Sequence, residues 1–333
     1  MKLSNRLPAA LPLARRPGPP APESGPTTWD TVKRSAHFVA GGAAFKTAKF
    51  IGEMWQGRQG LQDSPKVQIA RPVVFVPGFT TPVDPYLPLV AHLTDDGLNG
   101  GRTYFVRNGV IFNDHQCTQV VDSQRAPDAR VFVVMPFTRY DTPPRFAEQL
   151  KPDLEAVSRF TGSPVSDAVG YSMGGISTRL FLDQGGAGVG KFLMVGTPNQ
   201  GSKVGSLAHW AVKNDIGWAM ALANHAPAAL NALEWLRGVQ EDNPSLKELN
   251  SHWGHQRALV EEARVIGAEG LPTPGFSPWG WSSGDTAVEK AALGLPGLEV
   301  FTVSGGLTKS HETLMADPDV FREMSCFLGW NPI

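Results

Sequence analysis

The sequence predicts an α/β protein in which helices flank a mostly parallel sheet. One observation is a set of short apolar runs bounded by proline or glycine, at residues 73–76, 130–137 and 191–198, which is typical of buried parallel strands. Another is that helical patterns alternate with these runs, as at residues 144–160. The links between them are short, which favours repeated strand–helix–strand units.

Turn residues separate the expected elements along the chain. Asn108-Gly109 is a two-residue turn signal and predicts a small hairpin around it, and Thr161-Gly162 ends an amphipathic helix. The expected order is a strand at 73–76, a helix at 84–96, the hairpin at 103–112, a strand at 130–137, a helix at 144–160, a strand ending at Ser172, a helix from 173 to about 184, and strands at 191–198, 263–270 and 298–305.

The alternation of expected strands and helices is interrupted between residues 203 and 262. The stretch is rich in alanine, leucine and tryptophan and predicts two or three helices that are apolar over much of their surface. One interpretation is a packed helical insertion with a buried face. The other is a cap whose apolar face lines a pocket or opens toward lipid. We predict a cap insertion at about 203–262 within one domain that spans residues 65–333.

Two segments precede this domain. Residues 1–26 are rich in proline and predict a disordered arm, whose short apolar patch lacks the continuous core of a signal peptide. Residues 27–60 predict an amphipathic helical segment with basic side chains between its apolar positions. This segment either packs on the main body or, through residues 28–57, makes peripheral contact with a membrane as a basic amphipathic helix.

Composition narrows the class of protein. The chain has 333 residues and a net charge of −1 at pH 7, which fits a globular body with a sizeable core and gives no reason to expect nucleic acid as a partner. No apolar run approaches the ~20 residues of a membrane span and the start of the chain is no convincing signal peptide, so the compartment stays open between the cytoplasm and export by a non-classical route. Cys117 and Cys326 have no metal or redox spacing, and His252 and His255 lack a further ligand. We therefore expect no metal and no cofactor.

The residues Gly170-Tyr171-Ser172-Met173-Gly174 match G-x-S-x-G where a strand is expected to turn into a helix. So sharp a reversal forces strained dihedrals on the central residue, and the flanking glycines remove Cβ atoms that would collide. The Ser172 hydroxyl would then stand clear at the carboxyl edge of the sheet. A serine that merely fills a tight turn is the alternative, but the strand before it and the helix after it favour a nucleophile.

A serine hydroxyl is a weak nucleophile without a base, and the base needs a carboxylate. Among the 8 histidines, His311 follows the last expected strand and opens the final helix, at the same sheet edge as Ser172. The carboxylate should lie between them in the sequence, after a strand. Asp285 follows a glycine on a turn and is preferred, and Glu269, nearer the end of the preceding strand, is the competitor. The order Ser172, Asp285, His311 is the one known for G-x-S-x-G proteins of this class.

The negative charge that develops during such a reaction needs N–H donors. Met173 begins the expected helix, so its N–H is one candidate. Gly78 follows the first core strand and lets the backbone turn close to a substrate, so that the N–H of Phe79 is placed to be the second. The alternative is a plain strand-to-helix turn.

Six stretches in this order resemble the bacterial triacylglycerol lipase and esterase branch of the α/β-hydrolases: VVFVPGF, DAVGYSMGG, MVGTPNQGS, NPSLKELN, GDTAVEKAALGLPG and SHETLMADPDV. They cover most of residues 71–328 and are sparse in the insertion. The resemblance implies an α/β-hydrolase fold and a serine esterase that works through an acyl-enzyme. It carries the role of nucleophile to Ser172, of acid to Asp285, of base to His311 and of oxyanion donors to Phe79 and Met173.

The chain departs from that family at two places. Pro77-Gly78 stands where the family usually has His-Gly, and Asn199 stands where it commonly has a histidine. Neither is a position of the catalytic triad, so the departures affect the shape of the oxyanion loop rather than the chemistry.

The expected function is therefore the hydrolysis of acyl esters or lipids with apolar acyl groups, on a serine nucleophile. A phospholipase or a thioesterase would use the same three side chains. Two hypotheses belong to other classes: a catalytically silent hydrolase-fold module that binds lipid or protein, and a lipid-attacking effector that uses residues 28–57 as its membrane element.

Overall fold

The computed structural model describes residues 60–79, 84–122, 125–138, 140–213, 226–275, 280–305 and 309–333. The predicted arm at 1–26, the predicted helical segment at 27–60 apart from its last residue, and the candidate membrane element at 28–57 lie outside the described residues. Within these ranges no helix combines the length and the apolar character that crossing a membrane requires. Both cysteine thiols are free, Cys117 buried and Cys326 exposed.

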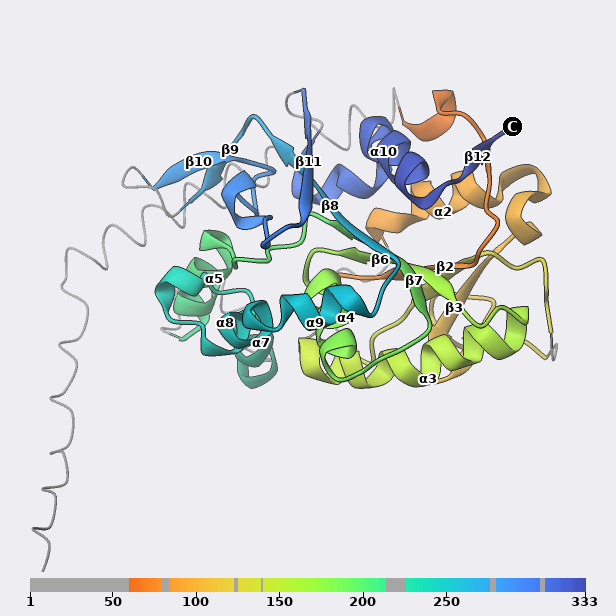
Figure 1. Ribbon diagram of the computed structural model, residues 1–333, viewed down its shortest axis with the longest axis horizontal. Helices are drawn as coiled ribbons and strands as arrows, with labels where there is room; N and C mark the ends of the chain where they lie inside the picture. The colour runs from red at the N-terminus through yellow and green to blue at the C-terminus, as the bar shows by residue number, and fades with distance from the viewer. Residues whose placement is uncertain are drawn as a thin grey trace, which may run out of the picture.

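A sheet of eight strands forms the centre of the part of the chain that the structure describes (Figure 1). The strands lie in the order β11-β8-β7-β6-β2-β5-β3-β4, and every neighbouring pair is parallel except β3 and β4. Their bounds are β2 (Val73–Val76), β3 (Thr103–Arg107), β4 (Val110–Phe112), β5 (Val131–Val134), β6 (Ser166–Tyr171), β7 (Val189–Val195), β8 (Glu262–Glu269) and β11 (Glu299–Ser304). The prediction of a mostly parallel α/β sheet is confirmed.

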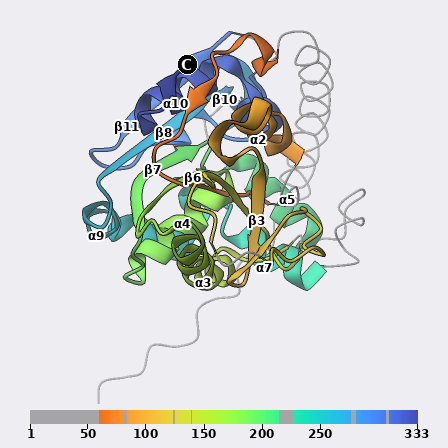
Figure 2. The same ribbon diagram turned by 90° about the vertical axis from the view of Figure 1, so that its right-hand side faces the viewer.

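Helices cover both faces of this sheet. They are α2 (Leu87–Thr94), α3 (Pro143–Thr161), α4 (Met173–Asp183) and α10 (Pro318–Leu328). Alternate residues of β2 belong to two separate buried clusters on opposite faces of the sheet. Val74 and Val76 pack with α3 and α4, whereas Val73 and Phe75 pack with α2 and α10. Figures 1 and 2 show the two pairs of helices on opposite sides of the sheet. Because both faces are covered, the inner strands β2 and β5 are apolar and buried at every position, which is why the sequence reveals them.

Short elements complete the described part of the chain. Residues 203–262 contain α5 (Lys203–Lys213), α7 (Ala226–Glu234), η4 (Val239–Glu241), α8 (Pro244–Ser251) and α9 (Trp253–Ala258). The other short helices and strands are η1 (Leu61–Asp63), η2 (Asp84–Tyr86), η3 (Asp95–Gly100), η5 (Lys290–Ala292), η6 (His311–Ala316), β1 (Val67–Gln68), β9 (Leu271–Pro274), β10 (Trp281–Gly284) and β12 (Asn331–Pro332). The insertion is therefore helical where it is described, and its service as a cap stays a prediction.

The hairpin predicted at 103–112 is confirmed. Strands β3 and β4 pair antiparallel with Arg107 opposite Val110. The two residues between them, Asn108 and Gly109, both have positive φ, as a tight turn between twisted strands requires.

The final helix differs from the prediction. His311 opens the short helix η6, and α10 begins only at Pro318. The Asp317 carboxylate accepts the N–H groups of Asp319 and Val320 and so caps α10, and proline is favoured at a first helical position. The Asp-Pro pair therefore starts a new helix instead of continuing the one that carries the histidine.

A buried carboxyl group makes the stability of the fold depend on pH. Asp153, on α3, is fully buried below the hairpin turn, where its carboxylate accepts the N–H of Gly109 at 2.7 Å and Nε2 of Gln149 at 2.9 Å. Burial raises the pKa of Asp153 to about 6, although both hydrogen bonds act to lower it. A folded-state pKa above the unfolded value of 3.8 means that the folded chain holds this proton more tightly. Stability is then lost as pH rises through the folded pKa.

We expect Asp153→Asn to reveal this loss. Relative to the variant, the wild type should lose up to about 3 kcal/mol of unfolding free energy between roughly pH 4 and pH 7, because its carboxylate must ionise while buried. Urea unfolding at several pH values measures the difference. A difference between the two proteins that does not change with pH would show that the pKa of Asp153 is not raised.

Candidate active site

The backbone at Ser172 is strained. Ser172 lies between the end of β6 and the start of α4, with φ 53° and ψ −125°. Residues other than glycine rarely adopt this backbone conformation. Strain of this kind costs on the order of 1–3 kcal/mol and persists only where the surroundings enforce it. Here the Ser172 N–H donates to the carbonyl of Val195 at 2.8 Å, and the Ser172 carbonyl accepts the N–H of Gly175 at 3.1 Å.

The two glycines of G-x-S-x-G are needed because other backbone lies against them. A Cβ on Gly170 would come within 2.6 Å of the Cα of Gly175. A Cβ on Gly174 would come within 2.0 Å of the carbonyl oxygen of Val76, at the end of β2. Real Cβ atoms do not approach backbone so closely, so the sharp turn at Ser172 depends on both positions.

We expect Gly174→Ala to destabilise the protein by about 2–3 kcal/mol, because its methyl group must push β2 away from α4. The loss should be seen despite the ~1 kcal/mol by which alanine normally exceeds glycine inside a helix. Gly254→Ala is the matched control, since a Cβ there meets nothing within 4 Å and the residue lies in helix α9. Urea unfolding should show the control more stable than the wild type. Equal stability of the two variants would contradict the close approach at Gly174.

Three side chains that are far apart in the sequence meet at this turn. Nε2 of His311 lies 2.9 Å from Oγ of Ser172, and Nδ1 of His311 lies 2.8 Å from Oδ2 of Asp285. All three residues are buried, with exposed fractions of 9% for Ser172, 1% for Asp285 and 8% for His311. Hydroxyl, imidazole and carboxylate thus form one continuous chain of hydrogen bonds.

The turn that carries Asp285 is held from several sides. Its second oxygen, Oδ1, accepts the N–H of Ala287 at 3.0 Å and that of Val288 at 2.7 Å. The next residue, Thr286, has φ 83°, which is strained for a β-branched residue, and its N–H donates to Oγ1 of Thr273 at 2.8 Å. Thr273 belongs to β9, which pairs with β10 in a two-stranded sheet just before the turn. This hairpin therefore fixes the direction of the carboxylate.

The competing carboxylate, Glu269, takes no part in this chain. It ends β8 and forms an ion pair with Lys290 at 2.5 Å, and it also accepts the hydroxyl of Thr302 at 3.2 Å. Of the two acids considered from the sequence, the structure brings only Asp285 to the imidazole of His311.

The surroundings of His311 act on its pKa in opposite directions. Burial lowers the pKa, while the charge of Asp285, the hydrogen bond to that carboxylate and the charge of Glu312 raise it. The net effect is a pKa above the usual 6.5. The site thus favours a positive charge on this ring more than water does.

The predicted oxyanion loop runs directly beside the serine. A Cβ on Gly78 would come within 2.9 Å of the Cβ of Ser172, so the chain after β2 passes in contact with the turn. Phe79 follows at once, and its partly buried ring packs against that of Tyr140 with 5.9 Å between centroids. Met173 is the first residue of α4, where backbone N–H groups have no partner within the helix. Phe79 and Met173 are thus the residues that directly follow Gly78 and Ser172, which lie close together.

Asn199, which stands where the resembling family commonly has histidine, is fully buried and has a structural role. Its side chain donates to the carbonyl of Leu293 at 2.7 Å and accepts from Arg179 at 3.0 Å. Arg179 is also fully buried and donates to Gln256 at 3.0 Å and to the carbonyl of Leu249 at 3.2 Å. Burial lowers the pKa of Arg179 to about 9. This network ties α4 to α8 and α9 and to the segment that follows Asp285.

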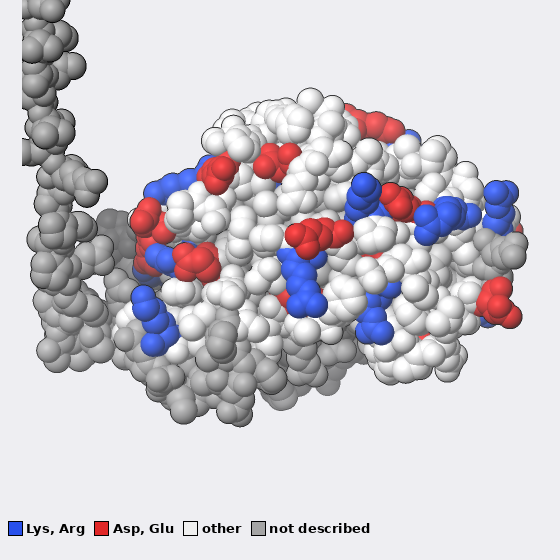
Figure 3. Space-filling model, turned by 90° about the horizontal axis from the view of Figure 1, so that it is seen from below, with Lys and Arg blue, Asp and Glu red and all other residues white. Residues whose placement is uncertain are grey.

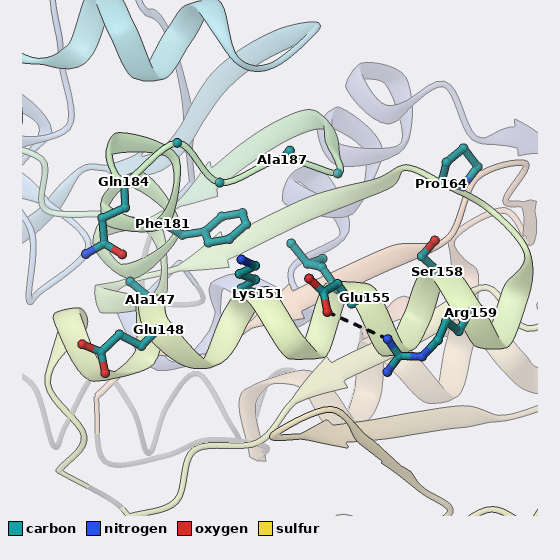
Figure 4. A pocket seen from close by; sticks show the side chains of 14 residues that line it. Ala147, Glu148, Lys151, Glu155, Ser158, Arg159, Pro164, Phe181, Gln184 and Ala187 are labelled. Carbon is teal, nitrogen blue, oxygen red and sulfur yellow. Dashed lines mark ion pairs between the residues drawn. The ribbon is translucent and has the colours of Figure 1, made fainter.

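A surface groove of about 790 Å³ lies elsewhere, between α3 and the turn after α4. Figure 4 shows Phe181 on one wall and Lys151, Glu155 and Arg159 along α3, with Glu155 and Arg159 paired at 3.9 Å. Helix α4 starts beside Ser172 and runs away from it, so the turn after α4 lies at the opposite edge of the sheet. Nothing in the lining of the groove connects it to the serine.

On the face drawn in Figure 3, basic and acidic side chains are interspersed.

Within the described ranges, no three His, Cys, Asp or Glu side chains converge as metal ligands do. His252, one of the H-x-x-H pair, is half exposed and lies 3.2 Å from Asp183, and His255 is exposed.

Sequence reasoning did not single out Tyr171, which touches His311 directly. The two rings stack with 5.1 Å between centroids at 28°, and the tyrosine hydroxyl donates to the carbonyl of His311 at 2.7 Å. In the sequence, Tyr171 is recognisable only as an aromatic residue immediately before the candidate nucleophile. Its contact with His311 spans 140 positions, and no local pattern predicts such a contact.

No protein-family model matches the sequence, and no curated protein matches it. Solved structures do. The lipase BlEst2 of Bacillus licheniformis in its mature form is 17% identical, with 80% of this chain and 93% of that chain covered and a TM-score of 0.51. Its propeptide form is 17% identical, with 78% of this chain and 52% of that chain covered and a TM-score of 0.51. A Listeria innocua gene product is 16% identical, with 78% and 94% covered and a TM-score of 0.48. The chain therefore has the α/β-hydrolase fold of this lipase, as the sequence resemblance implied.

Proposed function

We propose that the protein is a serine hydrolase of carboxylic esters, which acts on apolar acyl groups through an acyl-enzyme on Ser172. The observation that carries the proposal is the chain of hydrogen bonds from Ser172 through His311 to Asp285, built at a strained strand-to-helix turn. That the fold is shared with a protein named as a lipase also favours ester or lipid substrates.

In this mechanism His311 is the general base. Its Nε2 accepts the proton of Ser172 as Oγ attacks the ester carbonyl, and Asp285 holds the N–H of Nδ1 and stabilises the imidazolium that forms. The ring then gives the proton to the leaving alcohol. In the second half, Nε2 of His311 takes a proton from water as the water attacks the acyl carbonyl, and returns it to Oγ of Ser172 as the bond to the acyl group breaks and the acid leaves.

The oxyanion of each tetrahedral intermediate would be bound by the N–H groups of Phe79 and Met173. Both belong to backbone fixed by close packing at Gly78 and Gly174, so they need not reorganise when the charge develops. The helical insertion at 203–262 would serve as a cap that presents apolar surface to the acyl chain. The segment at 28–57 would supply peripheral membrane contact.

A panel of p-nitrophenyl esters from short to long acyl chains tests this function, together with labelling by a fluorophosphonate probe. We expect hydrolysis that varies with chain length, and a single adduct that mass spectrometry maps to the peptide containing Ser172. Hydrolysis of phospholipids or thioesters in preference to these esters would change the substrate class and keep the triad. A folded protein that neither turns over any ester nor reacts with the probe would instead be a silent binding module.

The acid limb of the rate profile should report His311. Only the neutral imidazole accepts a proton, so kcat/KM should fall as pH decreases through a pKa above 6.5. Glu312 raises this pKa, so Glu312→Gln should move the limb toward lower pH. Measurement of kcat/KM from about pH 5 to about pH 9 locates the acid limb in both proteins. A limb at or below the usual histidine value in the wild type would contradict the electrostatics described for the site.

A further inference from the structure

Two residues hold every polar group of His311 except Nε2. Its N–H donates to the carbonyl of Asp285 at 2.7 Å, and its Nδ1 bonds the carboxylate of the same residue. Its carbonyl accepts the hydroxyl of Tyr171 at 2.7 Å, and its ring lies stacked on the ring of that tyrosine. Asp285 thus holds the main-chain N–H and Nδ1 of the histidine, and Tyr171 holds its main-chain carbonyl and one face of its ring.

Tyr171 is itself rigidly placed. It ends β6, is almost fully buried, and meets Tyr86 edge to face with 5.8 Å between ring centroids at 88°. Burial holds the pKa of Tyr171 well above its usual value, so the hydroxyl keeps its proton and remains a donor. Because Ser172 is the next residue, the strand that delivers the hydroxyl to be activated also delivers the support for the base.

We infer that Tyr171 is a positioning residue for His311, holding the loop that bears the histidine through its hydroxyl and the imidazole through its ring face. The inference rests on the proposed function for its kinetic consequence, and on the contacts alone for its structural one. Without the hydroxyl, the main chain at His311 loses one of its two anchors. Without the ring, Nε2 loses the surface that keeps it in line with Oγ of Ser172. The π face also carries negative potential, which favours the imidazolium.

Tyr171→Phe isolates the hydroxyl, and Tyr86→Phe is its matched control. Tyr86 is equally buried in the same group of rings, and its hydroxyl donates to the carbonyl of Val76 at 3.1 Å instead of to the carbonyl of His311. We expect kcat of Tyr171→Phe to fall about 3- to 10-fold with KM near that of the wild type, as the loss of one hydrogen bond predicts. The control should lose comparable stability and keep its kcat. An unchanged kcat in Tyr171→Phe, or an equal fall in Tyr86→Phe, overturns the inference.

Tyr171→Leu removes the ring face as well, and NMR titration of histidine Cε1 signals reads the effect without any substrate. The signal of His311 is assigned by its loss in His311→Gln. Asp285 and Glu312, the charged groups acting on the ring, are unchanged in each tyrosine variant. We expect the pKa of His311 to fall by about 0.5 to 1 in Tyr171→Leu and to stay near the wild-type value in Tyr171→Phe.

The same pKa in all three proteins overturns the role of the ring. If the wild type hydrolyses no ester, the proposed function fails while the titration still decides whether Tyr171 supports the imidazole.

Discussion

Ser172→Ala is expected to lower kcat for ester hydrolysis by about 10⁴- to 10⁶-fold while the protein stays folded. Alanine keeps the Cβ and the strained backbone of the turn, so only the hydroxyl group and its hydrogen bond to His311 are lost. The residual rate would come from substrate binding and from the oxyanion donors. Steady-state rates on the best ester of the panel, with circular dichroism as the check on folding, measure the effect.

Ser177→Ala is the control for this result. Ser177 lies on the same helix, is fully buried, and uses its hydroxyl to bond the carbonyl of Met173 at 3.2 Å. Its loss should leave the rate near that of the wild type and cost only modest stability. A Ser172→Ala protein that keeps its activity and still reacts with the fluorophosphonate would place the nucleophile elsewhere.

The central strands could be predicted from the sequence because burial on both faces leaves a mark that does not depend on partners. Residues 73–76 and 191–195 are apolar at nearly every position, and β2 and β7 lie there. The turn at Ser172 is equally local, since a strand, two glycines and a helix suffice to define it. The α/β-hydrolase fold follows from such local features taken in order.

Other features depend on contacts that no local pattern records. Strand β9 contains Pro272 and Pro274, and proline within a run normally argues against a strand. Yet this hairpin carries the turn on which Asp285 lies. Glu269 ends β8, the neighbour of the edge strand β11, and so also met the expectation of an acid after a strand. Choosing between the two acids required the chemistry of a Gly-Asp turn, and the hydrogen bonds at Ala287 and Val288 are what make that turn rigid.

The buried network around Arg179 was likewise beyond the sequence. Its partners lie 20, 70 and 77 positions away along the chain. From the sequence, Asn199 is only a departure from a family pattern. In the structure its amide satisfies a buried guanidinium and a carbonyl at once, which a histidine with one donor and one acceptor would do in a different geometry. Long-range polar networks of this kind determine which departures a fold accepts.

Asp285→Asn is expected to lower kcat by about 10⁴-fold with little loss of stability. The asparagine oxygen would remain where Oδ1 now accepts the N–H groups of Ala287 and Val288, so the amide NH₂ would face Nδ1 of His311. Nδ1 must then accept a hydrogen bond, which places the ring proton on Nε2, and a protonated Nε2 cannot accept the proton of Ser172.

Glu269→Gln is the matched control, because it neutralises the other candidate acid at the end of β8. It should break only the surface ion pair with Lys290 and leave kcat near the wild-type value. Steady-state rates of the two variants on the same ester separate the acids. A large loss in Glu269→Gln with little in Asp285→Asn would mean that the working enzyme pairs His311 with the other carboxylate. That exchange would require the β9–β10 hairpin to leave its present place, since Thr273 now holds the turn through the N–H of Thr286.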